Sequence, residues 1–325
     1  MRAMVCRAWG APNVLQLENV PSRALRPGEV RIRVRAAGVN FADSLMVGGT
    51  YQVKPPFPFT PGLEAAGEVI ETGDGVPSLR TGQRVLAVLR NGGGYAEEIV
   101  LDAATVLPIP ETMDFVTAAA FPVAYGTSHF ALTHRGDLQS GETLLVLGAA
   151  GGVGLTAVEI GKARGARVIA AAGGAHKLAV ARSRGADELI DYRSESLRDR
   201  VRELTGGKGA DVVYDPVGGD AFDQALRAVN WEARMLVIGF AAGRIQAVPA
   251  NLILVKNISV IGVVWGAQTE RHPAWMSRTL AELLRWWEDG KLKPLIAKTF
   301  SLAEAGLALD ALVSRRYAGK VVLET

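Results

Sequence analysis

The stretch ETLLVLGAAGGVGLTAVEIGKARGARVIAAAGGAHK, residues 142–177, decides the fold. It opens with an apolar, β-favouring run at 144–147 and turns sharply at the glycines of 148–154. A helical run follows as far as Arg164, and a second strand is predicted at 167–172. A strand, a glycine loop, a helix and a second strand within about three dozen residues are the context that makes a dinucleotide-binding motif credible.

The glycine loop of this stretch fits a bound pyrophosphate. Glycines let the backbone approach the phosphates, and a helix that begins near Val153 directs unpaired N–H groups at the anion. The spacing of Gly148, Gly151 and Gly154 is G-x-x-G-x-x-G, which differs from the common G-x-G-x-x-G. A purely structural turn is the alternative, and the flanking strands and helix favour cofactor binding over it.

Composition narrows the class of protein. The 325 residues suggest two domains, and 49% hydrophobic residues with a mean hydropathy of +0.16 are enough for a large core. No uncharged apolar run is long enough to span a bilayer, and the N-terminus lacks the apolar core of a signal peptide. Cys6 is the only cysteine, and the net charge is +3 with both signs interspersed. We therefore expect a cytoplasmic protein that binds neither nucleic acid nor membrane.

The rest of the chain divides into two patterns. Residues 1 to about 120 read as short strands, among them 29–37 and 95–101, separated by Gly- and Pro-rich turns, which predicts a barrel-like β domain. From about 121 to 265, strands alternate with helices, the third strand at 188–191, which predicts a doubly wound parallel sheet. We predict a Rossmann domain at 123–265, inserted into a domain made of 1–122 and 266–325.

The end of the second strand bears on the choice of cofactor. NAD-binding sheets usually carry an acid there, but this strand ends Ala172-Gly173-Gly174, and no acid occurs between Glu159 and Asp187. Lys177 lies four residues beyond Gly173. A nearby cation without a carboxylate favours a 2′-phosphate, and hence NADPH. The simpler alternative is that Lys177 is a solvated lysine on a helix.

Four motifs together resemble one enzyme family. They are GAAGGVG at 148–154, AAGVNFAD at 36–43, PGLEAAGEV at 61–69 and DPVGG at 215–219. The chain is similar over essentially its whole length to the zinc-independent, zeta-crystallin-like quinone oxidoreductases of the medium-chain dehydrogenase/reductase superfamily. The family usually has Ala where Gly148 stands. The resemblance implies a GroES-like domain built from both chain ends, an inserted Rossmann domain and a homodimer joined along the Rossmann sheets.

The resemblance also assigns site residues. Asn40 is expected beside the nicotinamide and the substrate, and Tyr51 matches a tyrosine that enoyl-thioester reductases of the superfamily use as a proton donor. An aromatic side chain packed in a mobile loop is the equally weighted alternative for Tyr51. Thr127 is expected at the nicotinamide ribose, and Gly151, Gly152 and Val153 at the pyrophosphate. The residues expected at the 2′-phosphate are Gly173, Lys177 and Tyr192, and those expected to flank the nicotinamide end are Phe240 and Val264.

We expect no metal. The zinc-dependent relatives carry Cys where Asn40 stands, His where Leu63 stands, and a third ligand near Phe121-Pro122. None of these positions offers a thiolate or an imidazole. The cysteine-rich lobe that holds their second zinc is replaced here by residues 90–94, and the four histidines are scattered without ligand spacing.

Without a metal, the expected chemistry is hydride transfer from NADPH to a quinone or another α,β-unsaturated carbonyl acceptor. Reduction of enoyl thioesters is an alternative, which would require room and basic groups for a nucleotide tail. A structural or RNA-associated NADPH-binding protein is a second alternative. It is disfavoured because the sequence shows no basic stripe interleaved with aromatic residues.

Overall fold

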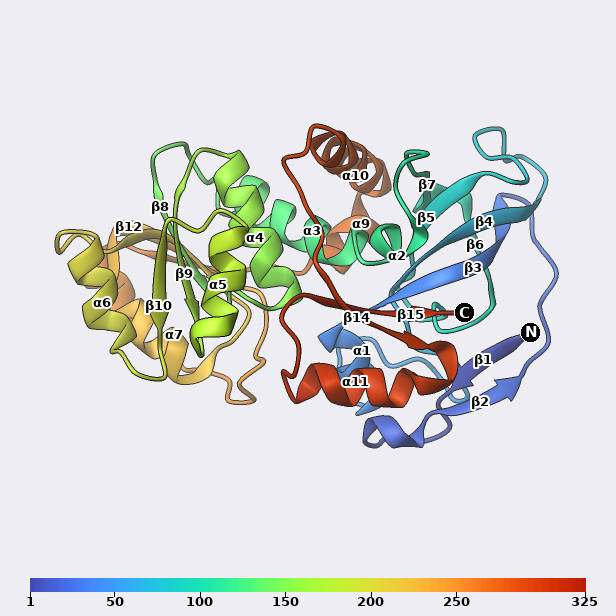
Figure 1. Ribbon diagram of the computed structural model, residues 1–325, viewed down its shortest axis with the longest axis horizontal. Coiled ribbons are helices and arrows are strands. Elements are labelled where there is room, and N and C mark those ends of the chain that lie inside the picture. Colours follow the sequence, from blue (N-terminus) through green and yellow to red (C-terminus); the bar gives the residue numbers. More distant parts are fainter. The chain divides into compact units, whose positions relative to one another are not determined.

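The computed structural model describes residues 1–325, with the side chain of Pro273 left out of the description. The chain separates into two compact units (Figure 1). Unit 1 consists of Met1–Val123, Thr269–Glu288 and Pro294–Thr325, and unit 2 consists of Ala124–Gln268 and Asp289–Lys293. The domain boundaries expected from the sequence, 122/123 and 265/266, stay a prediction.

Unit 1 is a β domain that both ends of the chain build. Its seven-stranded sheet has the order β14-β15-β3-β4-β5-β7, β6 also pairs with β3, and β1 and β2 form a separate two-stranded sheet. The strands are β1 (Arg2–Val5), β2 (Gln16–Asn19), β3 (Glu29–Val39), β4 (Glu64–Thr72), β5 (Arg84–Val88), β6 (Glu98–Asp102), β7 (Val106–Pro108), β14 (Ile296–Ser301) and β15 (Lys320–Glu324). The C-terminal β15 lies antiparallel to β3, with Val321 opposite Val39.

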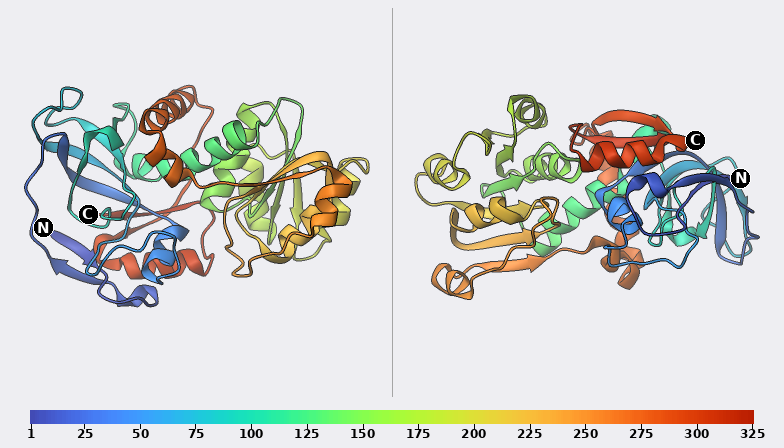
Figure 2. Two further views of the ribbon diagram at one scale, coloured as in Figure 1. Left: turned by 180° about the vertical axis from the view of Figure 1, so that it is seen from behind. Right: turned by 90° about the horizontal axis from the view of Figure 1, so that it is seen from below.

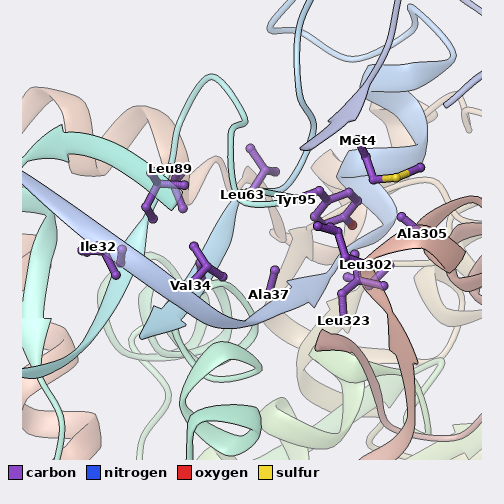
Figure 3. Packing of buried hydrophobic residues seen from close by; sticks show 14 of the residues in the cluster. Met4, Ile32, Val34, Ala37, Leu63, Leu89, Tyr95, Leu302, Ala305 and Leu323 are labelled. Carbon is purple, nitrogen blue, oxygen red and sulfur yellow. The ribbon is translucent and has the colours of Figure 1, made fainter. Parts of the chain in front are cut away.

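The helices of unit 1 are short except for α10. They are α1 (Phe41–Val47), α2 (Phe115–Ala119), α10 (Pro273–Glu288) and α11 (Ala305–Val313), with 3₁₀ turns η1 (Pro12–Val14), η2 (Ala103–Thr105) and η4 (Leu302–Glu304). Alternate residues of β3, among them Ile32 and Val34, enter one apolar core with residues from both chain ends (Figure 3). Tyr95 lies inside this core, so its hydroxyl needs a partner there.

Unit 2 is a doubly wound parallel sheet. Its strands are β8 (Thr143–Leu147), β9 (Arg167–Ala172), β10 (Glu188–Asp191), β11 (Ala210–Asp215), β12 (Val229–Val237) and β13 (Ser259–Gly262). Their order is β10-β9-β8-β11-β12-β13, and every pair is parallel. The order reverses between β8 and β11, which is the switch point where such sheets bind ligands.

Helices lie on both faces of this sheet (Figure 2). They are α4 (Gly152–Ala163), α5 (Ala175–Ser183), α6 (Leu197–Leu204), α7 (Gly219–Leu226) and α8 (Ala250–Lys256). Two helices, α3 (Pro122–His129) and α9 (Trp265–Arg271), contain the boundaries between the units, and a π-helical segment η3 (Phe130–Arg135) follows α3. Among the described residues, no helix is long and apolar enough to cross a bilayer.

The predicted elements match the structure best in unit 2. The ranges 167–172 and 188–191 coincide with β9 and β10, and 144–147 is β8 without its first residue. The predicted strand 95–101 is wrong at its start, because β6 begins only at Glu98 and Tyr95 is drawn into the core. The sequence reading also missed α1 and β14.

Candidate functional site

The glycine loop of unit 2 leaves the N-terminus of α4 open. Gly148 has a φ of 59°, which favours glycine, and its carbonyl accepts the N–H of Gly151 at 2.9 Å. A Cβ on Gly154 would collide with the carbonyl oxygen of Gly148, so glycine is required for this close approach. Gly151 caps α4 without any side-chain hydrogen bond. The first N–H groups of α4 are therefore not capped by a side chain, as an anion site requires.

Most of the predicted cofactor residues of unit 2 share one edge of the sheet. Gly151, Gly152 and Val153 follow β8, Gly173 follows β9, Tyr192 follows β10, Phe240 follows β12 and Val264 follows β13. Since all six strands are parallel, these segments lie at the same carboxyl edge. Thr127 lies on α3, and the hydroxyl of its neighbour Ser128 donates to the carbonyl of Val153 at 3.0 Å. The structure thus brings α3 against the first turn of α4.

A guanidinium lies over the turn after β9. A Cβ on Gly173 would lie 2.6 Å from Nε of Arg193, so the absence of a side chain at Gly173 makes room for this arginine. Arg193 is exposed and follows β10. Lys177 is half-buried on α5. The sequence reading missed Arg193, which adds a second basic side chain to this corner.

An acid is also present at this corner. Oδ1 of Asp191, the last residue of β10, accepts the N–H of Gly174 at 3.1 Å and the N–H of Arg193 at 3.0 Å. The sequence analysis looked for an acid only at the end of β9. This carboxylate comes instead from the end of the neighbouring parallel strand, β10. It holds the turns that carry Gly173 and Arg193.

The turn after β11 is fixed by a buried acid. Oδ1 of Asp215 accepts the N–H groups of Val217 and Gly218 at 2.8 and 2.9 Å, whereas Oδ2 has no partner. Burial raises the pKa of Asp215 to about 6, against the lowering effect of these two hydrogen bonds. Cδ1 of Phe240 lies 3.3 Å from the place of a Cβ on Gly218, so Phe240 covers this turn. Val264 is 58% exposed beyond β13.

In unit 1, Asn40 is the N-cap of α1. Asn40 and Asp43 form a capping box, in which the Asn40 side chain accepts the N–H of Asp43 and the Asp43 carboxylate accepts the Asn40 N–H at 2.8 Å. The side-chain amide of Asn40 donates to Oε1 of Glu64 at 2.8 Å. Asn40 is only 8% exposed, and the side-chain partners Glu64 and Lys320 both lie in unit 1.

Glu64 is a buried carboxylate with a buried cation beside it. Nζ of Lys320 lies 2.7 Å from its Oε1, and the two side chains are 7% and 0% exposed for Lys320 and Glu64. The other oxygen, Oε2, accepts the N–H of Val123 at 2.7 Å. A Cβ on Gly38 would collide with the Glu64 carboxylate, which explains the glycine of the motif AAGVN. A pair this deeply buried requires compensating hydrogen bonds, and these are present.

Asp43 completes the network. Its Oδ2 also accepts the hydroxyl of Tyr95 at 2.9 Å, and its Oδ1 has no partner. Complete burial raises the pKa of Asp43 to about 7, although the bonds from Asn40 and Tyr95 and the charge of Lys320 act in the opposite direction. In the protonated form of Asp43, the proton belongs on Oδ1, because Oδ2 accepts two hydrogen bonds.

Tyr51 lies just beyond a tight turn. Gly49 has a φ of 71°, and the N–H of Tyr51 donates to the carbonyl of Leu45 at 3.1 Å. The ring is partly buried against the core of unit 1. Burial raises the pKa of Tyr51 above its ordinary 10.0; the nearby Asp43 also raises it, and Arg90 lowers it. Its phenol therefore keeps its proton at neutral pH.

Comparisons with known proteins agree with this architecture. Residues 152–282 match a family model described as zinc-binding dehydrogenase, and residues 26–111 match the alcohol dehydrogenase GroES-like domain. A quinone oxidoreductase-like protein 2 homolog of Nematostella vectensis is 41% identical over 100% of this chain and 89% of its own length. A quinone oxidoreductase of Rattus norvegicus is 33% identical over 99% of this chain and 97% of its own length.

The chain belongs to the quinone oxidoreductase branch of the medium-chain dehydrogenase/reductase superfamily. The solved structure of Escherichia coli quinone oxidoreductase complexed with NADPH is 29% identical, with a TM-score of 0.93 over 100% of both chains. This confirms the family resemblance and the predicted fold, a GroES-like domain with a Rossmann-like sheet of six parallel strands.

The N–H groups and side chains of this chain's candidate site suit a phosphate-bearing cofactor better than a zinc ion. The uncapped helix, the side-chain-free turn at Gly173 and the basic Lys177 and Arg193 fit a dinucleotide with a 2′-phosphate. The family that residues 152–282 match is named for zinc binding. Around Asn40, however, the side chains are an amide, the Glu64 carboxylate already paired with an ammonium, the Asp43 carboxylate that accepts two hydrogen bonds, and a phenol. Within the described residues, no group of three His, Cys, Asp or Glu is arranged to hold a metal ion.

The sequence reading missed four members of the unit 1 network: Asp43, Glu64, Tyr95 and Lys320. Asn40 and Asp43 stand at the N-cap and N3 positions of α1, and this local signal was available. Glu64 and Lys320 lie 256 residues apart, and one chain offers no signal that pairs them.

Proposed function

We propose that this protein is an NADPH-dependent oxidoreductase that transfers a hydride to a quinone or another α,β-unsaturated carbonyl acceptor. The single observation that carries the proposal is the N-terminus of α4 without a side-chain cap, at the same sheet edge as the turns after β9 and β10 with Lys177 and Arg193. It is supported by the full-length similarity to quinone oxidoreductases, one of which is described in complex with NADPH.

The residues of unit 2 have separate tasks in this proposal. Gly151, Gly152 and Val153 face the pyrophosphate through the N–H groups of the first turn of α4. Gly173, Lys177, Tyr192 and Arg193 face the 2′-phosphate, where a basic group gains a charge-assisted hydrogen bond. Thr127 contacts the nicotinamide ribose, and Phe240 and Val264 flank the nicotinamide end. When bound, NADPH supplies the hydride.

The residues of unit 1 act on the acceptor. Asn40 offers its amide beside the nicotinamide and the substrate. An enone that receives a hydride at its β-carbon becomes an enolate, which must then be protonated at the α-carbon. Tyr51 is the proposed donor, because its raised pKa keeps the phenol protonated at neutral pH. A reduced quinone carries its charge on oxygen and exchanges protons with water.

We also propose a homodimer. In the described sheet of unit 2, β13 is an edge strand that pairs only with β12. Close to it along the chain, Leu254, Val255 and Val264 are 79%, 62% and 58% exposed. An exposed strand edge flanked by apolar side chains favours pairing with the same edge of a second copy.

A screen of acceptors tests the function. NADPH oxidation is followed with a simple quinone, a small enone and an enoyl thioester, using the wild type and Gly154→Ala. The added Cβ displaces the loop of Gly148, so this variant is expected to lose cofactor binding and turnover together. Turnover with quinone or enone by the wild type alone supports the proposal. Turnover confined to the thioester indicates an acyl reductase, and absence of any turnover with NADPH bound indicates a non-enzymatic role.

A further inference from the structure

Lys320 uses every hydrogen-bond donor that it has. An ammonium group carries three N–H donors and no acceptor. Nζ of Lys320 donates to the carbonyl of Val39 at 3.1 Å, to Oδ1 of Asn40 at 2.7 Å and to Oε1 of Glu64 at 2.7 Å. The side chain is 7% exposed. No donor of Lys320 is left for a substrate, so its effect on a reaction must pass through its neighbours.

The neighbour that Lys320 controls is Asn40. Since a lysine only donates, the atom of the Asn40 amide that faces it must be the carbonyl oxygen, which fixes which way the amide is turned. The amide nitrogen donates to Glu64 at 2.8 Å. Its other contact is a long one of 3.5 Å to the carbonyl of Gly38. One N–H of Asn40 is therefore committed, and the second is held only weakly.

The backbone of Asn40 is held independently of Lys320. Its N–H donates to Asp43 at 2.8 Å, and Asp43 is held in turn by Tyr95 at 2.9 Å. Loss of Lys320 therefore removes one of the bonds that orient the Asn40 side chain, while the bond to Glu64 and the bonds at the start of α1 remain. This separation makes the role of Lys320 accessible to experiment.

We propose that Lys320 is a positioning residue, which with Glu64 turns the Asn40 amide so that its second N–H donates to a carbonyl or carboxamide oxygen during hydride transfer. The inference rests on the proposed function and extends it to a residue at the opposite end of the chain. A role limited to neutralising the buried Glu64 is the competing explanation, since an unpaired buried carboxylate destabilises a fold.

A double-mutant cycle separates the two explanations. Lys320→Met, Asn40→Ala and the pair together are compared by kcat per NADPH-binding site, with binding measured by cofactor fluorescence. Loss of one well-oriented, charge-assisted contact is expected to lower kcat about 10- to 100-fold for Lys320→Met. In the Asn40→Ala background, Lys320→Met is expected to cause no further loss. Losses that multiply would overturn the positioning role.

Two further variants control for stability and charge. Val30→Ala weakens the same strand β3 ten residues from Asn40, at a side chain that is 0% exposed, and is expected to leave kcat per site unchanged. Glu64→Gln combined with Lys320→Met removes both charges of the pair. Under the proposal this protein stays slow, whereas recovery of the wild-type kcat means that Lys320 only neutralises Glu64.

An NMR measurement that requires no turnover reports directly on the side-chain amide of Asn40. In cofactor-free protein labelled with ¹⁵N-asparagine, the Asn40 side-chain signal is identified by its loss in Asn40→Ala. We expect it to be shifted and slow to exchange in the wild type and in Val30→Ala, and to move towards free-amide values in Lys320→Met. An unchanged signal in Lys320→Met refutes the proposal. An inactive wild type contradicts the proposed function, whereas an active wild type with independent losses contradicts only the role of Lys320.

Discussion

Replacing Asp43 with asparagine should remove a pH-dependent part of the stability of unit 1. In the folded protein, burial raises the pKa of Asp43 from 3.8 to about 7. Asparagine mimics the neutral acid, because its carbonyl oxygen can accept the bonds from the Asn40 N–H and the Tyr95 hydroxyl that reach Oδ2 in the wild type. Its amide then occupies the place of Oδ1, which has no partner in the wild type either.

The sign and the size follow from the two pKa values. A group whose pKa is raised on folding contributes its stability fully below pH 3.8 and loses it as the pH rises through about 7. Each factor of ten in proton affinity corresponds to about 1.4 kcal/mol, so the whole loss is about 4 kcal/mol. More than half of this loss, roughly 2 to 3 kcal/mol, falls between pH 5 and pH 8. The wild type should lose this much relative to Asp43→Asn over that interval.

The assay is the difference in unfolding free energy between the wild type and Asp43→Asn, from urea titrations at several values between pH 5 and pH 8. Other titrating groups, among them Asp215 and Glu159, are common to both proteins and cancel in this difference. Asp74→Asn serves as the control, because Asp74 is exposed in a turn of the same unit. A difference that stays constant within about 1 kcal/mol across the range would show that the folded Asp43 is ionised throughout, and would refute the reasoning.

Three other predictions address the cofactor, the proton and the assembly. NADPH should bind more tightly than NADH. Lys177→Ala and Arg193→Ala should each reduce this difference in affinity about 10- to 100-fold in titrations, with Arg198→Ala as the control. Equal affinities of the wild type for the two cofactors would refute the predicted preference. Tyr51→Phe should reduce kcat for an enone about 100-fold or more and barely affect a quinone, whereas small, equal losses would mean that the proton comes from solvent. Light scattering should give twice the chain mass of 34.4 kDa, and Ile261→Lys on β13 should yield the monomer; a wild-type monomer at micromolar concentration contradicts the dimer.

The fold of unit 2 was predictable because parallel strands are buried on both faces. Such strands read as short apolar runs bounded by glycine, and β8, β9 and β10 match the predicted ranges closely. The helix α1 was missed because its seven residues are too few to show a helical period, and only Asn40 separates them from β3. Its capping box, Asn40 with Asp43, is a local signal that a closer reading would have used.

The turns after β9 and β10 show why the cofactor-binding charges could not be predicted from the end of one strand. The absence of an acid after β9 was read correctly, but the neighbouring strand brings Asp191 to the same turn. It also brings Arg193, whose side chain fills the space above Gly173. Which strands are neighbours follows from the sheet order, and that order is a property of the folded chain. The sequence at the end of β9 therefore does not reveal all the charged side chains at this site, because β10 contributes some of them.

The network in unit 1 accounts for how the buried Glu64 carboxylate is held, because Lys320 lies beside it. Where zinc-dependent relatives place a thiolate, this chain places Asn40, and the cation beside Glu64 is the ammonium of Lys320. A catalytic zinc keeps a coordination position open for substrate, whereas all three donors of Lys320 are engaged by protein oxygens. The ammonium can balance Glu64 and orient Asn40, but it has no donor left to polarise an acceptor. In our proposal, substrate activation in unit 1 therefore comes from two other donors, the weakly held second N–H of Asn40 and the phenol of Tyr51.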